Sequence, residues 1–513
     1  MSQGAETGKV WLVGAGPGDP GLITVRGAEL LSRAEVVLHD ALSHPALLDL
    51  CPSAEKHDVG KRFGEESAVQ SDITSELIHW ARLGKRVVRL KGGDPLLFAR
   101  GAEEALALAD AGIPFEIVPG IASPVAASAY AGISLTHRDL SSSVTFITGS
   151  DREGKAWSPD AWRKLATATH TICVLMGMRR LEEIVRAIVD GGRDEATPVA
   201  VVQWGARPNQ RVVVGTLGTV AERVRAAGVT NPAVIIVGET VALREKMAWF
   251  DAQPLFGKRL LVPRPVEQAR STALAIRERG AEAVLEPAIA IEAAPDPDAV
   301  ARAAQSVGTY DWVVFTSQNG VARFWDALDA EGLDARAFGA ARVAVIGPKT
   351  GEALSSRGIR ADLVAPEYVA ESLVSALSSR ASGEGRGLGR VLVARALVAR
   401  DVVPEALRAH GAEVDVVAVY ETRAVRGPAR ERLRNTVETA DVVLFTSSSM
   451  VASLVEALGE RGRDALSKLT VACIGPVTRD TAERAGLRVD VVADVFTVEG
   501  LLDALEDYFR RRA

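Results

Sequence analysis

Residues 10–21 read VWLVGAGPGDPG, a short apolar run followed by a turn rich in glycine. This pattern is typical of a buried parallel strand whose carboxyl end faces a ligand, because glycine allows close backbone approach and positive φ angles. The turn differs from a dinucleotide-binding fingerprint, since Asp19 stands where the third glycine would be and Pro17 and Pro20 disfavour a helix inside the turn. The stretch indicates a binding site, with a ligand-free structural turn as the alternative.

Two later apolar runs end in comparable turns. Val87–Leu90 precedes Lys91–Pro95 (KGGDP), and Phe115–Val118 precedes Pro119-Gly120. Helix-like segments lie between these strands, and such alternation predicts a largely parallel α/β sheet. Because the carboxyl ends of parallel strands meet at one edge of a sheet, three such turns favour a shared binding site.

The pattern changes near residue 140. Further strands are expected over residues 144–148, 171–175, 199–203, 210–214 and 233–237. They predict a second α/β subdomain. An aromatic stretch, WFDAQPLFG at 249–257, closes the N-terminal half, and we expect a docked linker there.

The C-terminal half repeats itself at a spacing of about 130 residues. Three segments recur: RLLVPR at 259–264 as RVLVAR at 390–395, DWVVFTS at 311–317 as DVVLFTS at 441–447, and VIGP at 345–348 as CIGP at 473–476. Each copy alternates strands and helices, so the sequence predicts two similar α/β lobes with a cleft between them.

The composition is typical of a globular protein, with 47% hydrophobic and 25% charged residues among 513, enough for roughly three to four domains. The formal net charge of −6 argues against nucleic-acid binding, so local Lys and Arg must hold any anionic substrate. The three cysteines and seven histidines are scattered, which predicts no disulfide framework and no metal site. A polar N-terminus and the lack of a long apolar run predict a cytoplasmic protein without membrane contact.

Six motifs of the first half together resemble one family. They are Gly14–Pro20, Val59–Arg62, Leu90–Pro95, Val118–Ile121, Gly132–Arg138 and Met176-Gly177. Over residues 8–250 they resemble uroporphyrinogen-III C-methyltransferase, a tetrapyrrole methylase. The resemblance implies two α/β subdomains, at about 8–139 and 140–250, with S-adenosylmethionine in the cleft between them. It also implies methylation of two pyrrole carbons of uroporphyrinogen III, which gives precorrin-2.

The same resemblance implies the residues of the site. Cofactor contacts fall on Pro17, Gly92, Gly93, Asp94, Leu97, Ala122, Ser123, Met176, Gly205 and Ala233. The family's proton-handling pair falls on Asp40 and Lys61. One position departs from the family, because threonine is common where this chain has Ala122, although Ser123 keeps a hydroxyl in the same stretch.

The chemistry of the reaction agrees with this assignment. A pyrrole carbon becomes nucleophilic as its nitrogen loses a proton, so a carboxylate such as Asp40 at a strand end is a suitable base. A simple strand cap is the alternative for Asp40. The substrate carries several carboxylates, which Lys61, Arg62, His137 and Arg138 would bind at the opening. A solvated surface charge is the alternative for each of these four.

The second half, from about 257 to 513, resembles uroporphyrinogen-III synthase through its Phe-Thr-Ser and Ile-Gly-Pro turns and Tyr420-Glu421-Thr422. The resemblance implies cyclisation of hydroxymethylbilane with inversion of the last pyrrole ring and loss of water, without a cofactor. It also implies two lobes joined by a pair of strands, at 258–292 plus 420–513 and at 293–419, after a linker at 251–257. The product of this family is the substrate of the first half.

The synthase resemblance implies a role for Tyr420, which could donate a proton to the leaving hydroxyl; a half-buried packing residue is the alternative. Other hydroxyl groups lie at strand-end turns that suit carboxylates. They belong to Ser317, Thr350, Thr446, Ser447, Ser448 and Thr478. Helix capping is the alternative role for them, and the two roles are compatible.

These observations predict a bifunctional enzyme that makes uroporphyrinogen III and then methylates it, feeding sirohaem or cobalamin synthesis. One alternative is a methyltransferase whose C-terminal half is a non-catalytic docking module. A two-lobed binding protein and a dehydrogenase are further alternatives, the latter disfavoured by Asp19. The methylase resemblance implies a homodimer through the N-terminal half, with small tetrapyrroles as the other partners.

Overall fold

The computed structural model describes residues 7–60, 70–149, 157–367, 370–383, 387–399 and 401–512. The chain forms two compact units. Unit 1 holds the chain up to Arg259, together with Leu274–Glu282 and the residues from Leu505 onward. Unit 2 holds Leu260–Ala273 and Ala283–Ala504.

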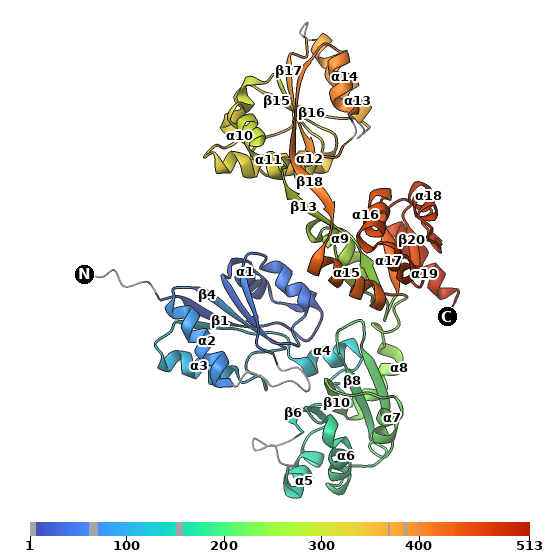
Figure 1. Cartoon of the computed structure of the whole chain (residues 1–513). Helices are drawn as coiled ribbons and strands as arrows, with labels where there is room; N and C mark the ends of the chain where they lie inside the picture. The colour runs from blue at the N-terminus through green and yellow to red at the C-terminus, as the bar shows by residue number, and fades with distance from the viewer. Residues whose placement is uncertain are drawn as a thin grey trace, which may run out of the picture. The chain divides into compact units, whose positions relative to one another are not determined.

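Unit 1 contains a five-stranded parallel sheet, here called the β1 sheet (Figure 1). Its order is β3 (Glu55–Asp58), β2 (Val36–His39), β4 (Arg86–Lys91), β1 (Lys9–Gly14) and β5 (Phe115–Val118). The helices α2 (Gln70–Arg82) and α3 (Gly101–Asp110) contribute Leu77 and Leu108 to the core on one face. The helix α1 (Val25–Arg33) packs in the core of the other face. The strands β1, β2 and β4 are mostly buried because both faces of the sheet are covered, whereas the edge strand β3 is polar and largely exposed. The predicted α/β fold is confirmed.

The three glycine-bearing turns of the β1 sheet meet at one point on its carboxyl edge. A Cβ on Gly14 would lie 2.5 Å from the Cα of Gly120 and 2.7 Å from the carbonyl oxygen of Gly93. The Gly93 N–H donates to the Gly16 carbonyl (2.8 Å), and the Gly16 N–H donates to the Gly93 carbonyl (3.2 Å). Backbones can approach this closely only where side chains are absent.

The second sheet of unit 1, here called the β7 sheet, is mixed. Its order is β6 (Val144–Thr148), β7 (Thr171–Leu175), β10 (Ala233–Val237), β8 (Pro198–Gln203) and β9 (Arg211–Thr216). Only β6 and β7 pair in parallel, and the remaining pairs are antiparallel. The helices α5 (Pro159–Ala168), α6 (Leu181–Asp190) and α7 (Val220–Ala226) pack in the core of one face. The helix α4 (Ser123–Tyr130) follows β5 in the chain but packs through Ala127 on the other face of the β7 sheet, so it connects the two sheets.

Unit 2 contains two further sheets. The β11 sheet has the order β12 (Glu282–Leu285), β11 (Arg259–Val262), β19 (Val442–Phe445), β20 (Thr470–Cys473) and β21 (Val491–Val492). The β17 sheet has the order β13 (Ile289–Ala293), β18 (Glu413–Ala424), β17 (Arg390–Ala396), β14 (Trp312–Phe315), β15 (Arg342–Val345) and β16 (Leu363–Val364). The strands β13 and β18 run antiparallel side by side, whereas β18, β17, β14, β15 and β16 are parallel (Figure 1).

Each sequence repeat of the C-terminal half is divided between these two sheets. The first repeat supplies β11 and β12 to one sheet and β13, β14, β15 and β16 to the other. The second repeat supplies β17 and β18 to the β17 sheet and β19, β20 and β21 to the β11 sheet. Because β11 matches β17, β19 matches β14 and β20 matches β15 in sequence, the two sheets have the same order of matching strands.

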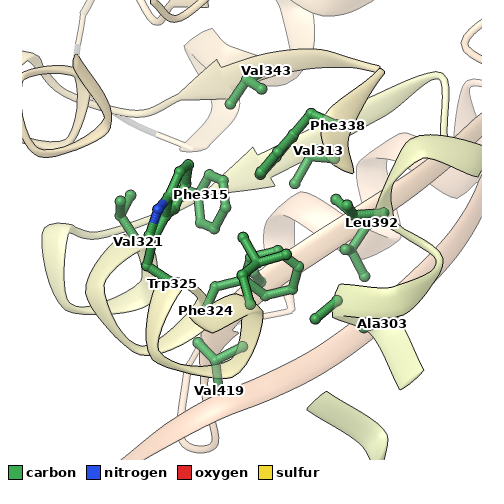
Figure 2. Packing of buried hydrophobic residues seen from close by; sticks show 14 of the residues in the cluster. Ala303, Val313, Phe315, Val321, Phe324, Trp325, Phe338, Val343, Leu392 and Val419 are labelled. Carbon is green, nitrogen blue, oxygen red and sulfur yellow. The ribbon is translucent and has the colours of Figure 1, made fainter. Parts of the chain in front are cut away.

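The core of the β17 sheet is rich in aromatic side chains. Figure 2 shows Phe315, Phe324, Trp325 and Phe338 packed together with Leu392. The rings of Trp325 and Phe338 stack with centroids 5.5 Å apart, and Phe315 meets Phe324 edge to face at 5.6 Å. Fully burying side chains of this size stabilises a fold by about 1.5–3 kcal/mol each.

Cys51, Cys173 and Cys473 are all buried free thiols. Within the residues that the structure describes, no helix is both long and apolar enough to cross a bilayer.

Candidate functional site

A cavity of about 760 Å³ opens in unit 1 where strand ends of the β1 sheet face the β7 sheet. Residues from both sheets line it. Nine of the lining residues were predicted from the sequence, eight of them as cofactor contacts and Asp40 as a proton-handling group. These candidates are Pro17, Gly92, Gly93, Leu97, Ser123, Met176, Gly205 and Ala233 for the cofactor, and Asp40.

 Gly16, in the glycine-rich stretch at 10–21, also lines the cavity, although it was not predicted as a cofactor contact.

Glycines give this cavity its shape. Gly93 has φ +70°, and a Cβ there would lie 3.1 Å from Ser123 Oγ. A Cβ on Gly205 would lie 2.6 Å from the Cβ of Ala127 on α4. Side chains at these positions would push the backbone or occupy the space that a ligand needs.

Three larger residues of the cavity wall have strained backbones. Phe98, Met176 and Trp204 have φ angles of +56°, +55° and +50°, in the left-handed region that non-glycine residues rarely adopt. Met176 is 61% exposed and Phe98 is 41% exposed, so apolar side chains face open space there. Strain of this kind concentrates at ligand sites, where the surrounding fold holds it in place.

Asp40 lies at the carboxyl end of β2 and is held by two donors. Arg89 Nη2 donates to Asp40 Oδ1 at 2.5 Å, and the Gly92 N–H donates to Asp40 Oδ2 at 3.2 Å. These two hydrogen bonds fix the orientation of the Asp40 carboxylate, which lines the cavity with the guanidinium of Arg89 beside it.

Arg89 belongs to a buried network of charges on β4 and α3. Arg89 Nε donates to Glu104 Oε1 at 3.2 Å, and Lys91 Nζ donates to the same oxygen at 2.9 Å. All three side chains are at most 3% exposed. Burial lowers the pKa of Lys91, with the positive charge of Arg89 as a further cause. This network was not predicted from the sequence, although the cations Arg89 and Lys91, on either side of Leu90 near the end of the strand RVVRLK, were a signal for it.

The cations that line the cavity differ from those expected. They are Arg179, Arg180 and Arg207. Arg207 lies over the ring of Trp204 with its guanidinium carbon 4.9 Å from the centroid, and burial lowers the pKa of Arg207. These arginines are far in sequence from the glycine turns, and only the neighbouring Met176-Gly177 motif could have drawn attention to Arg179 and Arg180.

Several predicted positions lie elsewhere. Among the described residues, the lining of this cavity does not include Asp94, Ala122, His137 or Arg138. Asp94 instead ties two turns together, because its Oδ1 accepts from Leu96 N–H (2.8 Å) and its Oδ2 accepts from Gly120 N–H (3.1 Å). His137 pairs with Ser141 through backbone hydrogen bonds, and Arg138 is exposed. Lys61 and Arg62 lie outside the described residues.

In unit 2, Tyr420 of β18 lies beside Ser317, which follows the end of β14. Their hydroxyl oxygens are 3.0 Å apart, and Tyr420 is 7% exposed. Ser317 also caps the helix α11 (Gln318–Ala330), where its Oγ accepts from the Gly320 N–H at 3.0 Å. Thr350 is buried in α12 (Pro348–Ser355), which follows β15.

The matching hydroxyl groups lie after β19 and β20 of the β11 sheet. Ser447 caps α16 (Ser448–Leu458) by accepting from the Met450 N–H at 3.4 Å. Ser448 Oγ donates to the Val477 carbonyl at 3.2 Å, and Thr446 Oγ1 lies 3.1 Å from Met450 Sδ. Thr478 is buried in α18 (Pro476–Arg484). The contacts of these residues fit helix capping and packing, and their role in substrate binding stays a prediction.

No group of three or more His, Cys, Asp or Glu side chains within the described ranges could hold a metal ion.

Two family models match the chain. Residues 9–221 match Tetrapyrrole (Corrin/Porphyrin) Methylases, and residues 270–503 match Uroporphyrinogen-III synthase HemD. The "Porphyrin biosynthesis protein HemD" of Ruminiclostridium josui is 37% identical over 502 residues, which cover 98% of each chain. The "Uroporphyrinogen-III C-methyltransferase" of Bacillus subtilis is 37% identical over 363 residues, covering 71% of this chain and 74% of the relative.

Several solved structures are also similar, and one of them contains a bound ligand. It is the uroporphyrin-III C-methyl transferase of Thermus thermophilus complexed with S-adenosyl homocysteine. The two chains are 40% identical, with a TM-score of 0.41, over 46% of this chain and 100% of the Thermus chain.

Proposed function

This chain belongs to the family of porphyrin biosynthesis proteins of the HemD type, with a tetrapyrrole methylase before a uroporphyrinogen-III synthase, and we propose that it performs two consecutive reactions. Its C-terminal half cyclises hydroxymethylbilane to uroporphyrinogen III with inversion of the last ring. Its N-terminal half then methylates uroporphyrinogen III twice to precorrin-2. We assign residues 8–250 to the methyltransferase, 251–257 to a linker and 258–513 to the synthase.

The cavity of unit 1 fits S-adenosylmethionine as the methyl donor. Its volume of about 760 Å³ lies within the usual size of small-molecule sites. A Cβ at Gly92 would have only the Leu42 Cβ within 4 Å, at 3.6 Å, so this turn leaves open space beside the backbone. Gly92, Gly93, Gly205 and Ala233 would hold the cofactor, which supplies an electrophilic methyl group when bound.

The chain's own residues position the substrate and move the proton. Asp40 accepts the pyrrole N–H proton, which raises the electron density of the ring carbon that is methylated. Arg89 holds the Asp40 carboxylate in place at the cavity through its hydrogen bond. Arg179, Arg180 and Arg207 pair with substrate carboxylates, for which guanidinium groups are well suited. Lys61 is proposed as the second proton-handling group on the strength of the family resemblance alone.

In the synthase half, Tyr420 protonates the leaving hydroxyl of hydroxymethylbilane. Because Ser317 Oγ accepts from Gly320, its own hydrogen is available to donate to Tyr420, which leaves the phenolic hydrogen for the substrate. The hydroxyl departs as water, and the substituted carbon of the last ring forms a new bond to the methylene carbon that carried it. The older bond between this ring carbon and its bridging methylene then breaks, and that methylene bonds to the free carbon of the same ring. The proton lost when the rearranged ring regains aromaticity returns to the phenolate, so the reaction balances without a cofactor. The hydroxyl-bearing turns of both sheets position the carboxylates of the substrate.

The gathering of Asp40 and eight predicted cofactor positions around one cavity supports the methyltransferase assignment most directly. The test gives the purified chain hydroxymethylbilane with and without S-adenosylmethionine, and identifies the oxidised porphyrins and methylated products. Type III isomer without the cofactor and precorrin-2 with it support both activities. Accumulation of the type I isomer, with added uroporphyrinogen III still methylated, would instead make the C-terminal half a docking module.

We further propose a homodimer through the methyltransferase half, which rests on the family resemblance. Sedimentation of the full chain tests it, and a monomer at micromolar concentration would contradict it.

A further inference from the structure

The two sheets of unit 2 carry matching arginines with different surroundings. Arg264 ends the segment RLLVPR after β11, and Arg395 ends the matching segment RVLVAR in β17. Both segments lead to a matching Gly-Ala-Glu, at 280–282 and 411–413, after the same number of residues. The positions between them can therefore be compared one to one.

Arg395 is neutralised by an acidic neighbour. Its Nη2 lies 2.5 Å from Asp401 Oδ1, and the arginine side chain is 12% exposed. The position that matches Asp401 in the first repeat is Arg270, an exposed residue on the helix α9 (Val266–Arg277). The second repeat thus pairs its arginine with a carboxylate where the first repeat places another cation.

Arg264 is half-buried and has a neutral partner. Its Nε donates to Gln268 Oε1 at 3.0 Å, and within the described residues no carboxylate oxygen forms an ion pair with it. Burial lowers the pKa of Arg264, which is the direction expected for a guanidinium that loses water without gaining an anion. A partly desolvated cation of this kind gains free energy when a carboxylate reaches it.

Arg264 is also connected to the candidate catalytic pair. Gln268 Nε2 lies 3.5 Å from Asn319 Oδ1, at the start of α11, and Ser317 caps that helix beside Tyr420. This places Arg264 within reach of a substrate that contacts the Tyr420–Ser317 pair.

We propose that Arg264 binds a carboxylate of the linear tetrapyrrole and that Arg270 adds to the positive charge of this edge. The inference rests on the synthase activity proposed above. Because the matching edge at Arg395 is internally paired, the substrate meets one cationic edge and one neutralised edge. This difference gives two otherwise similar sheets a way to distinguish the two ends of the substrate, which ring inversion at only one end requires.

The test compares R264Q, R264K and R270Q in the full chain, with hydroxymethylbilane as substrate and no S-adenosylmethionine. R264Q is expected to raise KM by about 10- to 100-fold, the effect of losing one charge-assisted pairing. R264K is expected to recover part of that loss, and R270Q to raise KM by a few-fold. More type I isomer is expected wherever slow turnover lets the substrate cyclise unaided.

A matched control is R336Q, because Arg336 is 92% exposed, pairs with Asp334 and lies away from the strand-end turns. It is expected to leave KM unchanged. Thermal unfolding of each variant shows whether a raised KM reflects weaker substrate binding or a destabilised fold. If R264Q is unstable, R264K still allows the proposed contact to be tested. An unchanged KM in R264Q or R264K overturns the inference while leaving the synthase activity intact. Absence of type III isomer from the unsubstituted chain overturns the proposed synthase function and the inference with it.

Discussion

In unit 1 the candidate base Asp40 lies at the end of a buried series of charges, whereas in unit 2 the candidate acid Tyr420 lies in a neutral pair with Ser317. Buried charges are costly to desolvate and must be fully paired, so the first site couples its function to the stability of its fold. A pair of hydroxyl groups makes a smaller demand, since each hydrogen bond contributes about 1 kcal/mol. In the proposed mechanisms, proton abstraction from a weak acid uses a preorganised charge, whereas ring closure mainly uses positioning.

The largest effect is expected when the charge at the first site is removed. D40A should keep cofactor binding and lose methylation by about 10²- to 10⁴-fold, the usual contribution of a positioned base. D40N should lose a similar amount, because an amide keeps the shape without the basicity. Calorimetric titration with S-adenosyl homocysteine and a methylation assay measure the two properties separately. Methylation within twofold of the unsubstituted chain would remove Asp40 from the mechanism.

The next prediction concerns the support behind Asp40. E104Q removes the carboxylate shared by Arg89 and Lys91, so two buried cations lose a counter-charge. We expect a loss of about 3–5 kcal/mol in the free energy of unfolding of unit 1, measured by urea denaturation. Methylation should fall with it, while formation of type III isomer by unit 2 continues.

The matched control is E103Q on the same helix, because Glu103 is 56% exposed and pairs with Arg100 on the surface. It is expected to change stability by less than about 1 kcal/mol. Equal stability of E104Q and E103Q would mean that the buried network is not important for the fold.

A change in the Tyr420–Ser317 pair is expected to affect synthase turnover more than stability. Y420F should lower the synthase turnover by about 10²-fold while costing only about 1 kcal/mol of stability, because one hydrogen bond to Ser317 is lost. Methylation of added uroporphyrinogen III should be unaffected. The control Y310F removes another buried hydroxyl of the same sheet, the one 2.8 Å from Asp415, and should leave turnover unchanged. Equal turnover of Y420F and Y310F would assign Tyr420 to packing.

The smallest expected effect is on the pH dependence of stability, which should differ between the two units. Burial, with the nearby charge of Arg207 as a further cause, lowers the pKa of His44 to about 4, and its Nδ1 accepts from the Ala46 N–H at 3.1 Å. Because the folded pKa lies below the ordinary value of 6.5, the unfolded chain takes up the proton first as the pH falls. The contribution to stability is therefore complete above pH 6.5 and is lost as the pH falls toward 4, by roughly 2 kcal/mol at pH 5.

H44N keeps an acceptor for Ala46 and cannot be protonated, so it should remove that part of the pH dependence. Urea midpoints at pH 7 and pH 5 measure it. H410N, at the histidine that the sequence places in unit 2, is the control and should behave like the unsubstituted chain. An identical loss of stability in H44N would locate the acid sensitivity elsewhere.

Much of the candidate site in unit 1 could be predicted from local sequence patterns. The turns after β1 and β4 and the motif at Met176 were predicted because a backbone that must approach a ligand needs glycine at set places. The cationic wall was not predicted, since Arg207 reaches the cavity from a loop that carries no such constraint. Arg138 illustrates the reverse, because a charged residue in a promising motif lies outside the cavity lining among the described residues.

In unit 2 the repeats predicted two similar α/β lobes, and the sheets have matching strand orders. The composition of each lobe needed the tertiary structure. A strand such as β11 is apolar enough to pair with either β14 or β19, and the observed partner is β19, from the other repeat.

Apolar periodicity, glycine turns and capping hydroxyls act over short distances along the chain, so many helices and strands and the residues at their ends could be predicted from the sequence. The pairing of strands into sheets, the cations that line the cavity and the arginine paired with a carboxylate became known from the three-dimensional structure. The reason is physical: pairing and charge compensation depend on distances in space between residues that are remote in sequence, and many arrangements satisfy the same local pattern.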